Sequence, residues 1–224
     1  MRASEMFDAL IFDWDGTLAD SRRVVVASFQ KALSDLDCEI SDAFIEQRIG
    51  IGSTETFKEI LHSCKTIFDE ALIRRLVKLK VRNEIEMSGG ITLFNGALRL
   101  LRSLQGRIRL GLASMNDRAV IEQLLRVMSL NKFFSAVVTA NNVVCSKPNP
   151  EIFLKCAGEL NCVPERCVVV EDSVFGVEAS KLANMSCIAV LTGAHSKEML
   201  EKANPDLIVN SLTESNEIIK FIFG

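Results

Sequence analysis

The stretch ALIFDWDGTL, residues 9–18, places two aspartates directly after a short apolar run. The run Ala9–Phe12 is too short for a helix and has no alternation of polar and apolar residues, which is typical of a strand buried on both faces. Ligands of open α/β folds bind at the carboxyl ends of the parallel strands. Asp13 and Asp15 are therefore the leading candidates for a functional site.

Further short apolar runs follow along the chain and predict more buried strands. These runs are Ile108–Ala113, Ala136–Thr139, Cys167–Val170, Cys187–Leu191 and Leu207–Val209. Between them, apolar residues such as Leu98, Leu101 and Leu104 recur three and four positions apart, which indicates amphipathic helices. The alternation predicts an α/β fold, a Rossmann-like parallel sheet with helices on both faces.

The interval from Asp20 to Gly90 interrupts this rhythm, because it has helical periodicity without a convincing strand. We interpret residues 20–90 as an inserted all-helical domain, and residues 1–19 and 91–224 as the α/β core. Asp20-Ser21 offers an N-cap for the first inserted helix, with Asp20 as the simplest capping residue. Ser88-Gly89-Gly90 supplies a flexible return to the core.

Composition restricts the classes of partner. The 224 residues are 48% hydrophobic and 25% charged, a mix that predicts a folded chain with a sizeable core. The net charge is −3 and no long basic run occurs, so a nucleic acid partner is not expected. Met1–Ala9 is too short and too charged for a signal sequence, and no apolar stretch reaches membrane-spanning length. We expect a soluble, cytoplasmic protein without a membrane partner, either a monomer or a weak homo-oligomer.

The seven cysteines are scattered, and none forms a CxxC pair that would indicate zinc or a redox centre. We expect all of them to be reduced and most to be buried as small hydrophobic residues.

Ser114-Met115-Asn116 follows the second predicted strand of the core. A hydroxyl and free backbone N–H groups just before a helix can bind phosphate oxygens. The alternative is that Ser114 or Asn116 only caps that helix, and on local sequence alone this alternative is favoured.

Lys147 precedes Pro148 in a loop that leads into a predicted helix. A lysine in a loop is most often only solvated, but the prolines on its C-terminal side, Pro148 and Pro150, favour a fixed position just before the helix, where the charge can act on a nearby anionic group.

Glu171 and Asp172 follow the apolar run Cys167–Val170. Two adjacent carboxylates at the end of a buried strand are costly unless a cation or a proton compensates their charge. The pair therefore predicts a site for a hard cation.

Taken in this order, the four motifs resemble those of the haloacid dehalogenase superfamily, most of whose members are phosphatases. The helical insert and the sequence Glu171-Asp172-Ser173 are similar to those of one branch of this superfamily. That branch contains β-phosphoglucomutase, phosphoglycolate phosphatase and small sugar phosphatases. Two positions depart from the pattern: Asn95 stands where relatives usually have proline, and Met115 where many have a small residue.

The resemblance implies a phosphatase that carries a covalent phosphate on Asp13, which must be ionised and keep a low pKa. Asp15 is then the general acid and base, with a raised pKa. The implied cofactor is Mg²⁺, and no organic cofactor is implied. Its implied ligands are the carboxylates of Asp13 and Asp172 and the backbone carbonyl of Asp15, with Glu171 acting through a water or from the surroundings. The residues implied for phosphate binding are Ser114, Met115, Asn116 and Lys147.

The insert would then close as a cap over a small phosphorylated metabolite of the sugar or polyol phosphate class. The residues we expect to face the substrate lie in a turn between two helices: Arg48, Gly50, Gly52 and Ser53. Two alternatives remain open, a phosphomutase of the β-phosphoglucomutase type and a non-catalytic binding module with the same fold. Val25 stands where mutase-type relatives usually present histidine, which favours hydrolysis.

Overall fold

The computed structural model describes residues 7–224. Residues 1–6 lie outside this range. The expectation that Met1–Ala9 is not a signal sequence therefore falls mostly outside the described residues. Within residues 7–224 no helix combines the length and the apolar character needed to cross a membrane.

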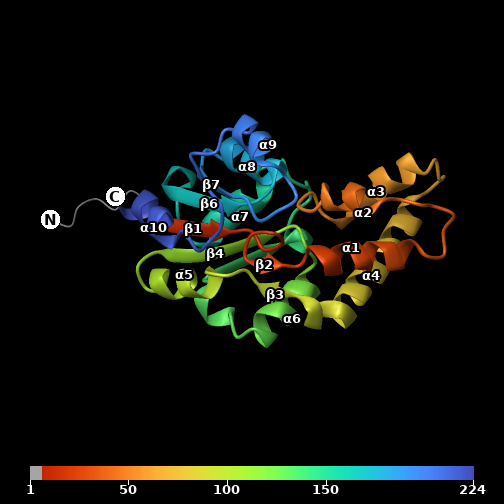
Figure 1. The fold of residues 1–224 in the computed structure, drawn as a ribbon, viewed down its shortest axis with the longest axis horizontal. Helices are drawn as coiled ribbons and strands as arrows, with labels where there is room; N and C mark the ends of the chain where they lie inside the picture. Colours follow the sequence, from red (N-terminus) through yellow and green to blue (C-terminus); the bar gives the residue numbers. More distant parts are fainter. Residues whose placement is uncertain (1–6) are drawn as a thin grey trace.

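Six parallel strands form the central sheet in the order β5-β4-β1-β6-β7-β8 (Figure 1). The strands are β1 (Ala9–Phe12), β4 (Arg109–Ser114), β5 (Ala136–Thr139), β6 (Cys167–Glu171), β7 (Ser186–Val190) and β8 (Leu207–Val209). The predicted α/β class is confirmed. Two strands end one residue later than their apolar runs. Strand β4 extends to Ser114, which pairs with β5, and β6 extends to Glu171, which pairs with β7.

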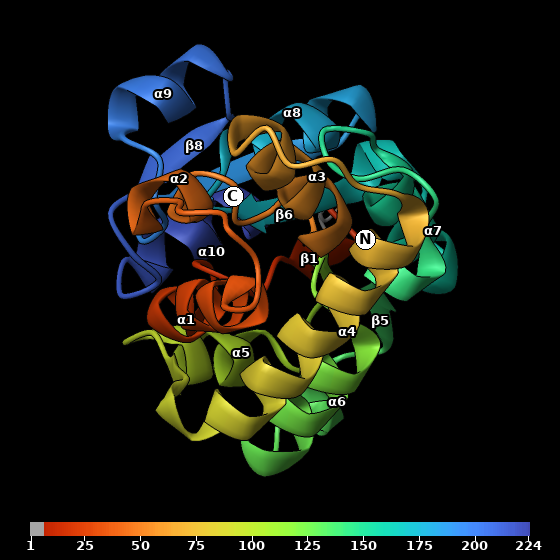
Figure 2. The ribbon, with the colours of Figure 1, turned by 90° about the vertical axis from the view of Figure 1, so that its right-hand side faces the viewer.

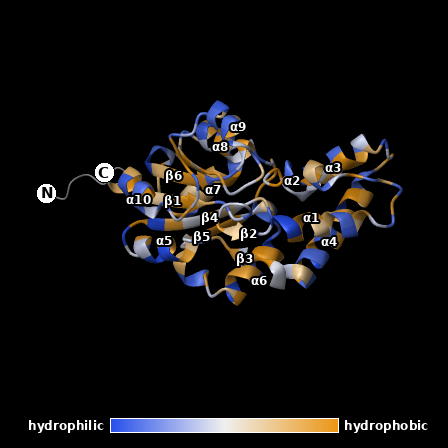
Figure 3. Cartoon of the chain, viewed as in Figure 1, coloured by the Kyte–Doolittle hydropathy of each residue, from blue (hydrophilic) through white to orange (hydrophobic). Residues whose placement is uncertain are grey.

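Helices cover both faces of the sheet, because successive side chains of a strand point to opposite sides. Leu10 and Phe12 of β1 pack in one cluster with helices α5, α6 and α10, whereas Ala9 and Ile11 pack in another with α7 and α8. Figure 3 shows the hydrophobic strands between helices that carry hydrophilic residues outward. The helices of the core are α5 (Ala97–Leu104), α6 (Arg118–Val127), α7 (Glu151–Glu159), α8 (Val174–Leu182), α9 (Lys197–Lys202) and α10 (Ser215–Phe223).

The four α-helices between β2 and β3 extend to one side of the sheet, beyond the carboxyl end of β1 (Figures 1 and 2). They are α1 (Arg22–Leu33), α2 (Asp42–Glu46), α3 (Ser53–Ser63) and α4 (Glu70–Met87). Most of their buried apolar residues, Phe29 and Phe57 among them, form a separate cluster, while Val24 of α1 and Ile85 of α4 pack with a cluster that flanks the sheet. This cluster gives the helices a core of their own, and the division at residues 20 and 90 stays a prediction.

A two-stranded antiparallel ribbon, β2 (Ala19–Asp20) with β3 (Thr92–Leu93), joins the start and the end of the helical segment. The expectation that Asp20 caps the first helix is wrong. Asp20 is exposed and paired with Thr92 in this ribbon, and Ser21 occupies the N-cap position without a capping hydrogen bond from its side chain.

The expectation that all cysteines are reduced is also wrong. Cys38, after α1, forms a disulfide with Cys64 at the end of α3, 26 residues away. The folding of the helical segment brings the two Cα atoms to 5.3 Å, which no local spacing of cysteines could indicate. The other five cysteines are free, and three of them, Cys156, Cys167 and Cys187, are buried as expected.

Candidate active site

The motif residues meet at the carboxyl edge of the sheet. Asp13 follows the central strand β1, and its backbone N–H donates to the carbonyl of Val170 in β6. Ser114 closes the neighbouring strand β4, and Glu171 closes β6 on the other side. Parallel pairing thus brings side chains from distant parts of the chain to the two flanks of Asp13.

Lys147 lies at the centre of the acidic group. Its Nζ is 2.7 Å from Oδ1 of Asp13 and 2.5 Å from Oε1 of Glu171, and the side chain is fully buried. Burial alone would lower the pKa of Lys147, but the charges of Asp13 and Glu171 outweigh it and hold the pKa above its ordinary value. The lysine is therefore a fixed positive charge beside Asp13, and the reading of it as a merely solvated residue is wrong.

Glu171 uses both of its carboxylate oxygens within the protein. Oε1 accepts from Lys147, while Oε2 accepts from the backbone N–H groups of Asp172 and Ser173 and from the Ser173 hydroxyl at 2.9–3.0 Å. A Cβ at Gly176 would come within 1.9 Å of this carboxylate, so the helix can approach it only with glycine there. These contacts fit a role for Glu171 in holding Lys147 and not in direct coordination.

Asp172 is held next to Asp13. Its Oδ1 accepts from the hydroxyl of Thr17 at 3.0 Å. A Cβ at either Gly16 or Gly193 would lie 2.3 or 1.9 Å from its Oδ2, so both glycines are needed for the close packing around it. Gly193, in the loop after β7, was not expected from the sequence, because it belongs to none of the four motifs.

The acidic group fits a hard divalent cation. Asp13, Glu171 and Asp172 are all buried, and each offers an oxygen within 4.8 Å of the others. Three carboxylates with one lysine leave an excess of negative charge in a site shielded from water, which is costly without a cation or a proton. Oxygen ligands of this kind suit Mg²⁺.

The expectation of a low pKa at Asp13 is wrong for the protein alone. Burial raises the pKa of Asp13 well above its ordinary value, the charges of Glu171 and Asp15 add to the rise, and Lys147 opposes it only in part. Burial likewise raises the pKa of Asp172. A cation beside both carboxylates would favour their ionised forms.

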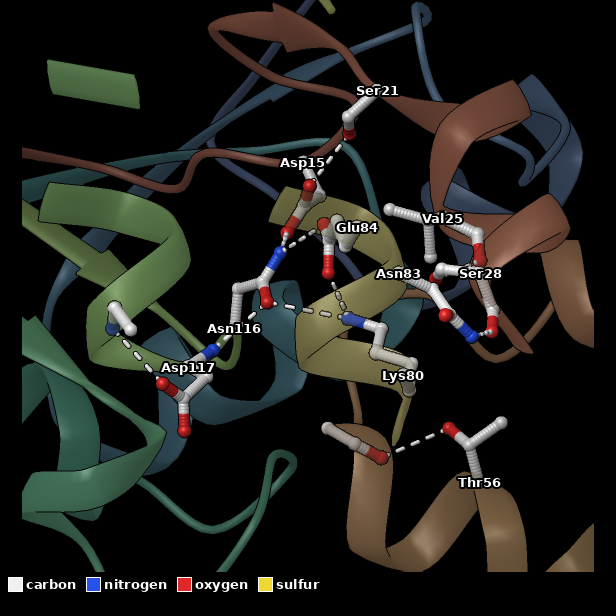
Figure 4. Close-up of polar contacts among 12 residues, drawn as sticks. Asp15, Ser21, Val25, Ser28, Thr56, Lys80, Asn83, Glu84, Asn116 and Asp117 are labelled. Atoms are coloured by element: carbon white, nitrogen blue, oxygen red, sulfur yellow. Dashed lines mark hydrogen bonds and ion pairs between the residues drawn. The ribbon is translucent and has the colours of Figure 1, made fainter. Parts of the chain in front are cut away.

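Asp15 lies in a different environment, as Figure 4 shows. Its Oδ1 accepts from the Ser21 hydroxyl at 2.6 Å, and its Oδ2 accepts from the Asn116 side-chain amide at 3.2 Å. Burial, with a further contribution from the charge of Glu84, raises the pKa of Asp15 to about 6. The raised pKa that was expected of a general acid is therefore present.

The segment Ser114-Met115-Asn116 differs from expectation in detail. The N-cap of α6 is Asp117, so neither Ser114 nor Asn116 has that role. The backbone N–H of Asn116 is not free, because it donates to the Ser114 hydroxyl oxygen at 3.1 Å. The Asn116 side chain points to Asp15 and to α4 (Figure 4), so the prediction that it binds phosphate finds no direct support in these contacts.

A cavity lies between the helical segment and the sheet, and it is lined by Asp13, Asp15, Met115 and Asn116 on the core side. The four candidates from the turn between α2 and α3 also line it: Arg48, Gly50, Gly52 and Ser53. Arg48 is partly engaged already, since its Nε pairs with Glu59 at 2.5 Å and its guanidinium stacks over Phe44.

The cavity wall also contains residues that were not expected there from the sequence: Phe29, Thr56 and Lys80. The burial of Lys80 could have been predicted from the sequence of α4. Helix α4 buries Ile73, Leu76, Lys80, Asn83 and Glu84, so its polar residues continue an apolar stripe at spacings of three and four. A charged residue on the buried stripe of a helix indicates a partner elsewhere in the structure.

Comparison with known proteins agrees with this geometry. A phosphorylated carbohydrates phosphatase of Thermotoga maritima is 31% identical over 216 residues, 92% of this chain and 99% of that protein. Pyrophosphatase PpaX of Oceanobacillus iheyensis is 27% identical over 212 residues, 94% of this chain and 95% of that protein. The crystal structure of a β-phosphoglucomutase from Clostridium difficile superposes with a TM-score of 0.83 at 28% identity, covering 96% of this chain and 100% of that one.

Residues 10–190 match the family described as haloacid dehalogenase-like hydrolase. The matched range contains the four motifs and the helical segment between the first two of them. The chain therefore belongs to the haloacid dehalogenase-like hydrolase family, in the branch of the phosphoglucomutases and sugar phosphatases.

Proposed function

We propose that this chain is a Mg²⁺-dependent phosphatase that hydrolyses a small phosphate monoester through an aspartyl-phosphate on Asp13. The observation that carries the proposal is the pairing of Lys147 with Asp13 and Glu171, beside Asp172 and within the same buried edge as Asp15. A nucleophile, a fixed positive charge, a cation site and a separate carboxyl group are the parts that phosphoryl transfer requires.

In the first step, an oxygen of Asp13 attacks the phosphorus, and the bond from phosphorus to the leaving oxygen breaks. Asp15 gives its proton to that oxygen, and its raised pKa supports this role because the acid must be protonated when the step begins. In the second step, Asp15 takes a proton from the water that attacks the aspartyl-phosphate. Release of phosphate restores both carboxyl groups to their starting forms.

Lys147 and the hydroxyl of Ser114 would hold the phosphoryl oxygens where negative charge accumulates during transfer. The carboxylates of Asp13 and Asp172 and the backbone carbonyl of Asp15 would hold Mg²⁺. When bound, the ion would favour ionised Asp13 and neutralise charge on the phosphoryl oxygens.

The proposed substrate class is a sugar or polyol phosphate. The cavity places polar side chains of the helical segment, such as Arg48, Ser53 and Thr56, opposite Asp13 and Asp15. The named relatives include a phosphorylated carbohydrates phosphatase and a fructose-1-phosphate phosphatase. Release of phosphate from 4-nitrophenyl phosphate with Mg²⁺ tests the activity itself, and a panel of phosphorylated metabolites then tests the class. Absence of phosphate release from all of these compounds would contradict the proposal.

Removal of the metal is the first expected test of the cation site. Chelation with EDTA should abolish phosphate release, and excess Mg²⁺ should restore it. Asp172→Ala should raise the Mg²⁺ concentration for half-maximal activity by more than about 100-fold, since losing even an outer partner of a metal ligand costs about 10–100-fold. The matched control is Asp37→Ala, an exposed aspartate in the helical segment. Full activity of the wild type in EDTA would contradict the metal role.

Hydrolysis should prevail over isomerisation, although a solved relative is a β-phosphoglucomutase. Val25 lines the cavity beside Asp13 and Asp15, and its side chain cannot make the polar contact that the resemblance associates with mutases. Incubation with β-glucose 1-phosphate, a trace of the 1,6-bisphosphate and Mg²⁺ should release free phosphate faster than it forms glucose 6-phosphate. The opposite ratio would show that another cap residue, such as Arg48 or Lys58, makes the contact, and would favour the mutase.

A further inference from the structure

Lys80 and Glu84 form an ion pair in the interior of the protein. They lie one helical turn apart on α4, and their side chains are 2% and 0% exposed. A buried ion pair is costly to form, because both charges lose their hydration and a similar pair of apolar residues would often be at least as stable. Stability alone therefore does not explain why this pair is buried.

The pair forms hydrogen bonds with Asn116 of the core (Figure 4). Lys80 donates to Oδ1 of Asn116 at 3.2 Å, and Nδ2 of Asn116 donates to Oε1 of Glu84 at 2.7 Å. The same Nδ2 donates to Oδ2 of Asp15 at 3.2 Å. A continuous path of polar contacts therefore joins α4 to Asp15.

The two charges distinguish the two ends of the Asn116 amide. Lys80 can only donate and therefore faces the oxygen, while ionised Glu84 can only accept and therefore faces the NH₂ group. If the amide turned over, its oxygen would face two carboxylates and its NH₂ group would face an ammonium. The pair, together with the backbone N–H of Asp117, which donates to the same amide oxygen at 2.8 Å, thus holds the NH₂ group toward Asp15.

We propose that Glu84 is a positioning residue for the acid–base step: with Lys80 it fixes the Asn116 amide, which with Ser21 fixes the orientation of the Asp15 carboxyl group. This inference rests on the proposed function, because it assumes that Asp15 protonates the leaving group. It also gives α4 a part in the chemistry beyond enclosing the substrate, since the charges that orient Asn116 come from the helical segment.

Glu84→Gln tests the proposal with little change in volume. Glutamine has one oxygen and one NH₂ group, so it cannot accept from both Asn116 and Lys80. Whichever way it turns, one donor faces another donor, so the side chains of α4 no longer hold both ends of the Asn116 amide, and its oxygen keeps the backbone N–H of Asp117 as a donor. A less well oriented Asp15 should matter most for leaving groups that need a proton.

The readout is the dependence of kcat/KM on leaving-group acidity in phenyl phosphates, from phenyl phosphate to 4-nitrophenyl phosphate. These esters are of similar size, so a change in binding affects them alike. Glu84→Gln should lower kcat/KM for phenyl phosphate about tenfold more than for 4-nitrophenyl phosphate, a part of the ~10²–10⁴-fold that a positioned acid supplies.

Asn83→Ala is the matched control. Asn83 is the preceding residue of α4, is also buried, and donates to the carbonyl of Ser28 in α1 instead of to Asn116. Its removal should lower the melting temperature and leave the dependence on leaving-group acidity unchanged. An equal change in both variants would show a general loosening of α4 and overturn the proposal.

If Glu84→Gln leaves too little folded protein because Lys80 loses its partner, Lys80→Met/Glu84→Met removes both charges at once and should show the same steeper dependence. An active wild type whose dependence on leaving-group acidity is unchanged in the folded variant would overturn this inference alone. A wild type inactive on every ester would overturn the proposed function, and the inference with it.

Discussion

Asp13→Asn is expected to abolish turnover and to leave the protein folded. The amide is a far weaker nucleophile and metal ligand than the carboxylate. Loss of the nucleophile in an enzyme with a covalent intermediate typically lowers kcat by about 10⁶-fold. The measurement is phosphate release at saturating substrate and Mg²⁺, with mass spectrometry of the protein to exclude asparagine that has reverted to aspartate.

The fold should survive this change because the substitution relieves crowding of like charges. Asp13, Glu171 and Asp172 share one lysine, and Lys147 keeps Glu171 as a partner when Asp13 is neutral. The melting temperature of Asp13→Asn should therefore match or exceed that of the wild type without metal. Turnover well above background in protein of verified sequence would show that another residue is the nucleophile.

Asp15→Asn is expected to slow both half-reactions, because it removes the proton donor for the leaving group and the base for water. Loss of a positioned acid–base group typically costs about 10²–10⁴-fold. In the wild type, the side-chain amide of Asn116 donates to Asp15. Asparagine at position 15 places against it either an NH₂ group, which cannot accept, or, with the amide turned over, its oxygen. The orientation of the side chain is therefore disturbed together with its chemistry.

Rapid mixing with 4-nitrophenyl phosphate separates the two steps. Formation of the aspartyl-phosphate from this ester needs little help from an acid, whereas its hydrolysis still needs the base. Asp15→Asn should show a burst of nitrophenol close to the enzyme concentration, followed by slow turnover, and acid-quenched protein should carry phosphate. Steady-state rates equal to the wild type would assign the proton transfers to another group.

The local sequence was sufficient to predict the fold class and the position of each motif. An apolar run such as Ala9–Phe12 predicts a buried strand from its own residues, and parallel strands end at one edge of the sheet. Asp13, Ser114, Glu171 and Asp172 were therefore correctly expected at that edge. The turn with Gly50 and Gly52, which was expected to face the substrate, lines the same cavity as Asp13 and Asp15.

The partners of each side chain were decided only by the tertiary structure. Lys80 and Glu84 continue the apolar stripe of α4, which indicates burial but not their partner. Packing of α4 against the core places them beside Asn116, and Asn116 in turn contacts Asp15. The raised pKa of Asp13 has the same origin, because burial depends on every segment around the site.

The disulfide between Cys38 and Cys64 shows the same limit, since the cysteines stand 26 residues apart in segments with no spacing rule between them. Periodicity and turn residues act over a few positions, so the sequence by itself determined the elements of this protein and the residue types that end them. Distances between side chains depend on how those elements pack, a property of the whole chain, and they decided which charges share a site and which residues orient Asp15.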